Sequence, residues 1–160
     1  MTENKKIVIG WFSFSCCEDS SVMLTELLNE HYKEWLKIID FKYVKILRKK
    51  RPIGPMDVGF IEGAIASKEQ EDEVKKIREN AKKVVAIGSC ACTGMPSGNR
   101  NAFDEATKQE IKALIEKFNY GEKVKKLEEV VEVDYKVPGC PMNNKKFLET
   151  LDIIVKEFSK

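Results

Sequence analysis

The 160-residue sequence has a single histidine, little net charge and no long hydrophobic run. With His31 as its sole histidine, the chain offers little support for a histidine-activated nucleophile. A formal charge of +2 lacks the clustered positive charge with which proteins bind nucleic-acid phosphates. No segment approaches the roughly 18 consecutive apolar residues of a membrane-spanning helix. We therefore expect no nucleic-acid partner and no direct insertion into a membrane.

Hydrophobic residues make up 42% of the sequence, and charged residues of both signs make up 34%. These fractions are typical of a folded domain with one core, and we expect a single domain over residues 1–160. The first residues, Met1 to Lys6, lead directly into an apolar, β-branched segment and do not have the pattern of a signal peptide. We therefore expect a cytoplasmic location.

Short apolar runs alternate along the chain with longer segments whose apolar residues recur every three or four positions. The predicted strands are Lys6–Phe14, Tyr43–Leu47, Asp57–Ile65, Val84–Ile87 and Val130–Val137. The predicted helices are Glu18–Ile39, Lys68–Lys82, Phe103–Phe118 and Phe147–Phe158, the last with a cap near Asn143 or Asn144. Alternation of this kind predicts an α/β fold, a flavodoxin-like three-layer sandwich with a mostly parallel sheet.

Three further expectations concern side chains and loops. Residues 89–101, rich in glycine, serine, proline and asparagine, are predicted to form a loop. In the helix predicted after it, the apolar residues are expected to face inward; they are Ile111, Leu114, Ile115 and Phe118. The basic segment 45–51 is expected to be a solvated loop, with docking of an acidic partner as the alternative.

The five cysteines occur in three separate places, and each place follows a predicted strand. Cys16 and Cys17 follow the first strand, Cys90 and Cys92 the fourth, and Cys140 the fifth. Parallel strands end at one edge of a sheet, where ligands bind, so we expect these thiols to meet there. In a cytosolic chain, an odd number of cysteines indicates ligands or reactive thiols more than disulfides.

Backbone-permissive residues flank the later cysteines, in the sequences Gly88-Ser89-Cys90 and Gly139-Cys140. Such loops can turn amide N–H groups toward a sulfur-rich anion and so adjust its potential. Gly88, Ser89 and Gly139 are therefore candidate cofactor-binding residues. Glu62, at the end of the third strand, is a further candidate: it either forms hydrogen bonds beside the cofactor, joins a proton path, or is a solvated loop carboxylate.

Four converging thiolates are typical of a 4Fe-4S cluster or of a four-cysteine structural zinc site. Structural zinc sites normally use two closely spaced pairs of ligands, and that spacing is absent here. The scattered positions favour a cluster, with zinc and unlinked thiols as alternatives. Cys92 is expected to be a small packing residue, or else an alternative ligand.

The order of these motifs resembles the small subunit of [NiFe]-hydrogenases and its relative, the 20 kDa subunit of respiratory complex I. The motifs are Cys16-Cys17, Gly59-Phe60-Ile61-Glu62-Gly63, Gly88-Ser89-Cys90 and Val137-Pro138-Gly139-Cys140-Pro141. The stretches Gly59 to Glu73 and Arg100 to Phe103 look most like cytosolic, cofactor-reducing bidirectional hydrogenases.

This resemblance implies one proximal 4Fe-4S cluster held by Cys16, Cys17, Cys90 and Cys140. Hydrogenases usually separate the first two cysteines by two residues, whereas adjacent cysteines are the habit of complex I. Hydrogenase spacing would place the first ligand on Phe14, which cannot bind iron, so the adjacent pair must supply both ligands. The sequence shows no cysteine-rich C-terminal extension, and we expect ligands for one cluster only.

The implied function is electron relay between the nickel-iron centre of a large subunit and a diaphorase-like or ferredoxin-like partner. The alternative is a complex I-like or membrane-hydrogenase subunit, which the Cys16-Cys17 pair favours. A flavodoxin-like FMN carrier is a third reading. It lacks a clear Ser/Thr-rich phosphate loop after the first strand and leaves the order of the cysteines unexplained; no residue demonstrates FMN.

Overall fold

A single parallel sheet organises the computed structural model, which describes residues 5–44, 47 and 52–159. All of its neighbouring strands pair in parallel, in the order β2-β1-β3-β4-β5. The strands are β1 (Ile7–Ser13), β2 (Ile39–Val44), β3 (Met56–Glu62), β4 (Ala81–Ile87) and β5 (Tyr135–Val137). This is the strand order of flavodoxin-like folds, so the predicted fold class is confirmed.

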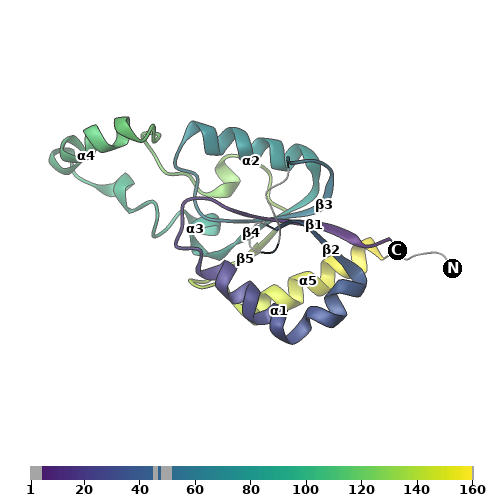
Figure 1. Cartoon of the computed structure of the whole chain (residues 1–160). Coiled ribbons are helices and arrows are strands. Elements are labelled where there is room, and N and C mark those ends of the chain that lie inside the picture. Colours follow the sequence, from purple (N-terminus) through teal and green to yellow (C-terminus); the bar gives the residue numbers. More distant parts are fainter. Residues whose placement is uncertain (1–4, 45–46, 48–51, 160) are drawn as a thin grey trace.

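Helices cover both faces of the sheet (Figure 1). α1 (Asp19–Ile38) and α5 (Asn144–Phe158) pack on one face, and α2 (Lys68–Asn80) packs on the other. The α1/α5 side is aromatic: the rings of Trp11 and Phe60 stack with centroids 5.8 Å apart, and Phe147 packs edge-on against Trp11. On the α2 side, Val74 and Ile77 are fully buried against the sheet. Because successive strand residues face opposite sides, β1 and β3 supply both cores.

Helix capping agrees with the sequence prediction at the last helix. The side chain of Asn143 accepts a hydrogen bond from the N–H of Lys146 at 2.8 Å, and α5 begins directly after Asn143, at Asn144. Ser67 caps α2 in the same way by accepting from the N–H of Gln70. These caps satisfy N–H groups that have no partner within the helix.

The predicted strand Tyr43–Leu47 begins four residues too late (43 − 39), and its residues 45–46 lie outside the described residues. β2 begins at Ile39, directly after α1, and Ile39 and Phe41 face the α1/α5-side core two residues apart as a strand requires. The register with β1 shifts after Phe41, so that Tyr43 faces the other core. Ile39 also fits the helical period of the preceding segment, which extended the predicted helix by one residue. Most of the basic segment, residues 45–46 and 48–51, lies outside the described residues. The solvated loop expected there, and its alternative of a docking site for an acidic partner, therefore stay predictions.

The predicted strand Val130–Val137 is also wrong in its extent, because β5 begins at Tyr135. A short 3-10 helix, Leu127–Glu129, precedes it, and the N–H of Asp134 donates to the carbonyl of Val84 at 2.9 Å directly before the strand begins. The carboxylate of Asp134 accepts a hydrogen bond from the backbone N–H of Val84 at 2.8 Å, a place that a strand carbonyl fills elsewhere in the sheet. The three valines before β5, Val130, Val131 and Val133, pack as loop residues against the α2-side core.

The segment predicted as a loop, residues 89–101, contains two short helical elements. They are α3 (Gly88–Thr93) and a 3-10 helix, Asn99–Ala102. Neither is long enough to show an apolar period in the sequence. α3 follows β4 without a break, so Cys90 lies on a helical turn at the carboxyl edge of the sheet.

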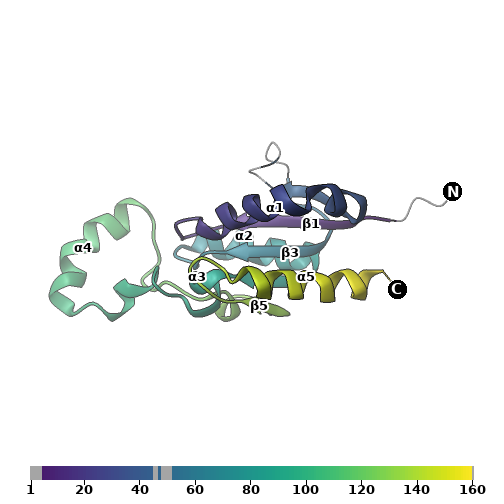
Figure 2. The ribbon, with the colours of Figure 1, turned by 90° about the horizontal axis from the view of Figure 1, so that it is seen from below.

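The predicted inward face of the next helix is wrong. α4 (Glu105–Lys117) has no buried residue, and Leu114 and Phe118 are 55% and 58% exposed. Figures 1 and 2 show that α4 stands apart from the body, beyond the end of the sheet where the strands finish. The predicted helix is present, but its apolar face does not pack against the core of this chain. No helix within the described ranges is long and apolar enough to cross a membrane.

Candidate metal centre

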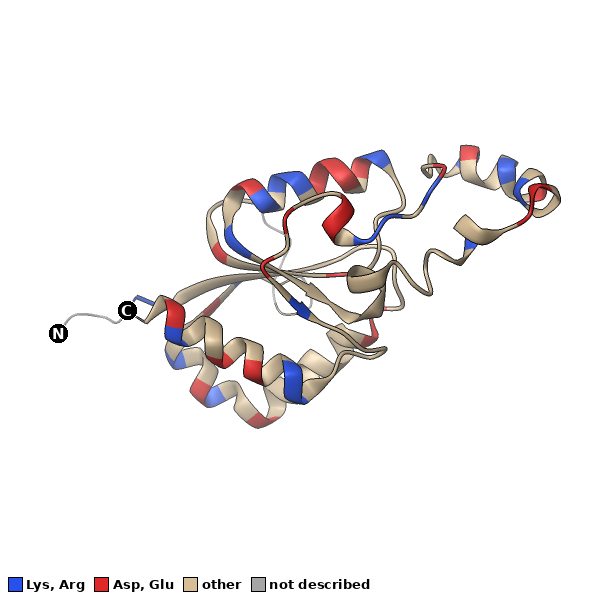
Figure 3. Ribbon diagram, turned by 180° about the vertical axis from the view of Figure 1, so that it is seen from behind, with Lys and Arg blue, Asp and Glu red and all other residues tan. Residues whose placement is uncertain are grey.

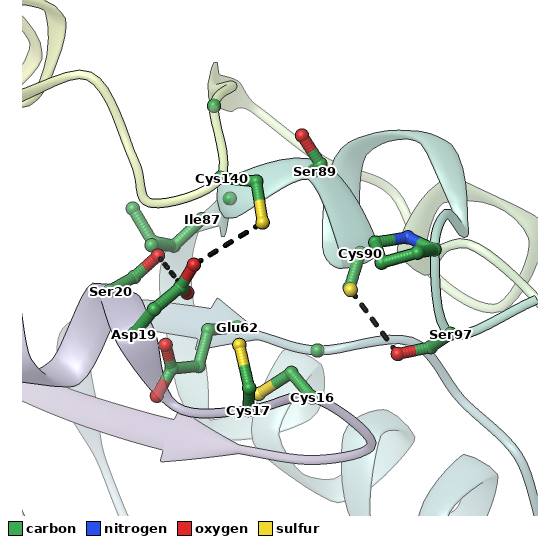
Figure 4. A pocket seen from close by; sticks show the side chains of 14 residues that line it. Cys16, Cys17, Asp19, Ser20, Glu62, Ile87, Ser89, Cys90, Ser97 and Cys140 are labelled. Carbon is green, nitrogen blue, oxygen red and sulfur yellow. Dashed lines mark hydrogen bonds between the residues drawn. The ribbon is translucent and has the colours of Figure 1, made fainter.

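Three loops at the carboxyl edge of the sheet border one cavity of about 230 Å³. The loops follow β1, β4 and β5, and Figure 4 shows their cysteines arranged around the space. The eight residues predicted from the sequence all line it: Cys16, Cys17, Cys90, Cys140, Glu62, Gly88, Ser89 and Gly139. The topology thus brings together residues that are up to 124 positions apart (140 − 16) in the sequence.

The first loop turns sharply because of Glu18, which has a φ of 60° between Cys17 and the start of α1. Two backbone hydrogen bonds between Ser15 and Ala64, both of 3.0 Å, fasten this loop to the chain after β3. Within this loop, Cys16 is half-buried and Cys17 is exposed. The pair therefore presents two thiols from adjacent positions to the cavity (Figure 4).

The second and third loops are joined to each other through glycine backbone. Gly139 has a φ of 123°, and its carbonyl accepts a hydrogen bond of 2.7 Å from the N–H of Ser89. Gly88 has a φ of 77°, and a Cβ atom there would lie 3.0 Å from the hydroxyl of Ser20. Glycine is the residue that adopts these left-handed conformations without steric cost. The two loops can therefore approach closely enough for Cys90 and Cys140 to face one cavity.

Glu62 is buried, with 2% of its surface exposed, and the alternative of a solvated loop carboxylate is wrong. Its carboxylate accepts hydrogen bonds from the hydroxyls of Ser13 and Ser21, from the N–H of Ser21 at 3.2 Å and from the indole N–H of Trp11 at 3.4 Å. The donors lie on β1 and α1, on either side of the Cys16–Cys17 loop. Glu62 thus joins three elements next to the cavity.

The surroundings oppose free thiolates in this cavity. Burial raises the pKa of the Cys16 thiol to about 12, and the negative charges of Glu62, Cys90 and Cys17 add to the rise. The pKa of Cys140 is also raised, first by its hydrogen bond to Asp19 and then by the charges of Asp19, Cys17 and Cys90. Converging thiolates are stable only when cationic metal lies among them, because a bound cation reverses this repulsion.

The donor set fits a four-iron cluster better than a single zinc ion. Among the described residues, which include every cysteine, no group of three His, Cys, Asp or Glu side chains is arranged to hold one metal ion. A mononuclear zinc site requires four ligands within about 2.3 Å of one point. In a cubane cluster each thiolate binds a different iron, so the cysteines surround a space instead of converging on a point. A cavity with four cysteines at its wall has that form.

Cys92 does not line the cavity. It is buried in the α2-side core, where its S–H contacts the carbonyl of Ala86 at 3.6 Å, and burial raises its pKa to about 11. This position favours the packing role expected for it. The sequence interpretation missed three polar residues of the cavity. The carboxylate of Asp19 accepts from Cys140 at 3.3 Å, the hydroxyl of Ser97 lies 3.2 Å from Cys90, and Ser20 lines the cavity beside Asp19.

Two of these three residues have another signal in the sequence. Asp19 and Ser20 have the pattern of residues that favour a helix N-terminus, and only the fold shows that this helix begins beside Cys140. Ser97 lies in a segment without regular structure, and no pattern in the sequence relates it to Cys90.

Several known proteins are similar to this chain. One subunit of the F420-non-reducing hydrogenase of Methanothermobacter marburgensis is 29% identical over 95% of this chain and 54% of its own length. The delta subunit of the NAD-reducing hydrogenase HoxS of Cupriavidus necator is 29% identical over 61% of this chain and 54% of its own length. The chain therefore spans about half the length of the curated relatives it matches.

Among solved structures, a chain of the NAD+-reducing [NiFe]-hydrogenase in the H2-reduced state superposes with a TM-score of 0.83 and 21% identity, covering 96% of this chain and 93% of that one. That likeness shows the fold. The sequence pattern of the family described as NADH ubiquinone oxidoreductase, 20 Kd subunit, matches residues 16–154, which include all five cysteines. The chain belongs to this family, as the order of its cysteine motifs indicated.

Proposed function

We propose that this chain is the small, electron-transferring subunit of a [NiFe]-hydrogenase. The observation that carries the proposal is the cavity at the carboxyl edge, where four cysteines from three loops face one space. The relatives named above support it, since they are hydrogenase subunits that match most of this chain. In this role the chain takes part in an oxidoreductase reaction without holding the catalytic centre.

Cys16, Cys17, Cys90 and Cys140 would hold one 4Fe-4S cluster. When bound, such a cluster supplies one-electron transfer at a potential that depends on its surroundings. The chain itself fixes the four thiols and restricts water on the buried side, where Cys16, Cys90 and Ile87 lie. Gly88, Ser89 and Gly139 bring the loop backbones together, and Glu62 fastens the first loop.

Cys17 and Cys140 are exposed, so the cavity is open on one side. Electron transfer through a partially wet site is slowed by solvent reorganisation, and a partner that covers this opening would remove the water. We assign the opening to the hydrogenase large subunit, which would hold the nickel-iron centre and activate hydrogen. A diaphorase-like or ferredoxin-like subunit is the second partner, in the cytoplasm; the NAD-reducing relative favours the diaphorase-like type.

A complex I-like or membrane-hydrogenase subunit is the second candidate. The adjacent cysteines, Cys16 and Cys17, favour it, and so does the name of the matching family. Both candidates use the same four ligands. Nickel in the partner that covers the cavity distinguishes a hydrogenase from a complex I-like assembly.

Metal content of the native complex tests the proposal. The chain carries an affinity tag in its native source and is purified anaerobically with its partners, and iron, nickel and zinc are measured per chain. Iron together with nickel is the expected result. Iron without nickel favours the complex I-like candidate, and zinc alone at about one per chain, the stoichiometry of a closed structural site, overturns the cluster assignment.

A further inference from the structure

α4 and the segment that follows it expose apolar side chains on a part of the molecule that has no core of its own. Leu114 and Phe118 are more than half exposed, and Tyr120 is 45% exposed. The rings of Phe118 and Tyr120 pack against each other with centroids 6.1 Å apart. Scattered exposed apolar residues are ordinary, but a gathered set on one projecting element marks an interaction site.

The projecting segment, residues 99–124, is held in place by hydrogen bonds at its base. The guanidinium of Arg100 donates to the carbonyls of Gly121 and Glu122 at 2.6 and 2.8 Å. Asn101 exchanges two hydrogen bonds with the backbone of Val124, at 2.7 and 2.8 Å. The outgoing and returning parts of the chain are thus joined, which fixes the position of α4 before any partner binds. A surface ordered in advance loses less entropy on binding.

The segment 99–124 and the body of the protein enclose a groove of about 590 Å³. Its apolar wall comes from both sides: Phe14 and Ala66 on the body, and Ile111, Leu114, Ile115 and Tyr120 on the projecting segment. The charges of α4 are mixed in sign (Figure 3), and Arg100 is the one charged residue among those described that line the groove. Its guanidinium already binds two carbonyls.

Three further polar groups in the groove, the hydroxyls of Ser15 and Ser97 and the side-chain oxygen of Gln70, are engaged within the chain. The hydroxyl of Ser15 donates to the side chain of Gln70 at 3.2 Å, and that same oxygen of Gln70 accepts from the N–H of Ala66 at 2.7 Å. The hydroxyl of Ser97 donates to the carbonyl of Ser15 at 2.7 Å. A ligand that needs charge or many hydrogen bonds finds little to bind here. The chemistry of the groove suits an uncharged, apolar polypeptide segment.

The groove is continuous with the cysteine cavity, because Cys16 and Ser97 line both. A polypeptide that fills the groove therefore lies against the same cysteine that borders the candidate cluster site. We propose that the groove binds an apolar segment of the hydrogenase large subunit, and that α4 serves as the docking element that holds this subunit over the cysteine cavity. This inference rests on the proposed function, which supplies the identity of the partner.

The test compares two substitutions in the tagged native complex, with nickel per chain as the measure of retained large subunit. Leu114→Glu places a charge in the apolar wall of the groove. Ile153→Glu makes the same kind of change at a 49% exposed residue of α5, outside the groove and the cavity. We expect Leu114→Glu to weaken retention of nickel at least tenfold and Ile153→Glu to leave it within about twofold of the parent. Because Leu114 is exposed, the variant chain should remain folded.

A photo-crosslinking amino acid at position 114 then identifies the occupant, with the same amino acid at position 153 as the control. A product that contains this chain and the nickel-binding subunit supports the inference. A product of two copies of this chain, or no loss of nickel in Leu114→Glu, overturns it, while a nickel-containing parent complex leaves the proposed function standing. A parent complex with iron but no nickel refutes the proposed function itself, and with it the assigned occupant.

Discussion

The backbone N–H of Ser21, in the first turn of α1, donates a hydrogen bond of 3.2 Å to the carboxylate of Glu62 at the end of β3. This contact crosses from the strand next to β1 into the helix that follows the Cys16–Cys17 loop. Ser13, on the other side of the loop, donates to the same carboxylate at 2.6 Å. Glu62 therefore binds both ends of the segment that presents the first two thiols.

Glu62→Gln should loosen this loop. The amide keeps the volume of the side chain but replaces one acceptor oxygen with a donor group, which then faces donors from Ser13 and Ser21. We expect a loss of about 1–3 kcal/mol in the free energy of unfolding, the cost of an unsatisfied buried polar group. Urea unfolding of the metal-free chain and iron content of the native complex measure the two effects, and iron is expected to fall.

The control is Glu34→Gln, which makes the same chemical change on an exposed part of α1. It should alter the free energy of unfolding by less than about 0.5 kcal/mol. If Glu62→Gln behaves like this control in both measurements, Glu62 does not position the loop.

The ligand assignment predicts opposite results for two cysteines. Cys140→Ala removes an exposed thiol from the cavity wall and should abolish cluster incorporation while the sheet remains folded. Cys92→Ala removes a buried thiol outside the cavity and should cost about 1 kcal/mol of stability, as loss of a small buried group does, with iron unchanged. Iron analysis and circular dichroism of both variants provide the comparison. Full iron content in Cys140→Ala would refute the assignment.

These positions show why the sequence placed the candidate residues at one cavity better than it predicted the outer parts of the fold. Cys16, Cys90 and Cys140 each follow a strand, and parallel topology requires the ends of such strands to lie at one edge. One general rule was therefore enough to bring together residues that are distant in sequence. The eight predicted residues form one cavity lining for that reason.

α4 shows the limit of the same approach. Its apolar spacing predicts a helix with one apolar face, and α4 is such a helix, but the spacing does not say which molecule covers that face. Leu114 has the pattern of a core residue and lies on the surface. Similarly, Ile39 satisfies both helical and strand periods, and only pairing with Ile7 of β1 decides in favour of the strand.

Gly139→Ala tests whether the backbone of the third loop sets the position of Cys140. At a φ of 123°, an alanine Cβ would lie 2.5 Å from the carbonyl oxygen of Pro141, so the loop must shift. Strained backbone of this kind costs about 1–3 kcal/mol. We expect reduced stability and a reduced yield of cluster, measured by urea unfolding and iron content. Gly121→Ala is the matched control, because a Cβ there meets its nearest atoms at an ordinary 3.5 Å; equal results for the two variants would contradict the prediction.

Acid should weaken the junction between β4 and β5 through Asp134. Burial alone would raise the pKa of this carboxyl, but hydrogen bonds from the N–H of Val84 and from Lys83, with the charge of Arg78, outweigh burial and hold the pKa below its usual 3.8. Because the unfolded chain takes up the proton more readily, the stabilisation is complete above about pH 4 and is lost as the pH falls through the folded-state pKa. Asp134→Asn should cost about 1–3 kcal/mol near neutral pH, where the charged acceptor is replaced.

Urea unfolding of the metal-free chain at a series of values between about pH 3 and pH 7 separates this effect from general acid denaturation. The difference in unfolding free energy between the parent and Asp134→Asn should shrink toward the acid end, because the parent then loses the charge that the variant never had. Asp152→Asn, at an exposed position of α5, should stay within about 0.5 kcal/mol of the parent throughout. A parent-to-Asp134→Asn difference that does not change with pH would mean that the variant loses stability only because its amide group offers one acceptor oxygen in place of two, and that the charge of Asp134 contributes nothing to holding β5 against β4.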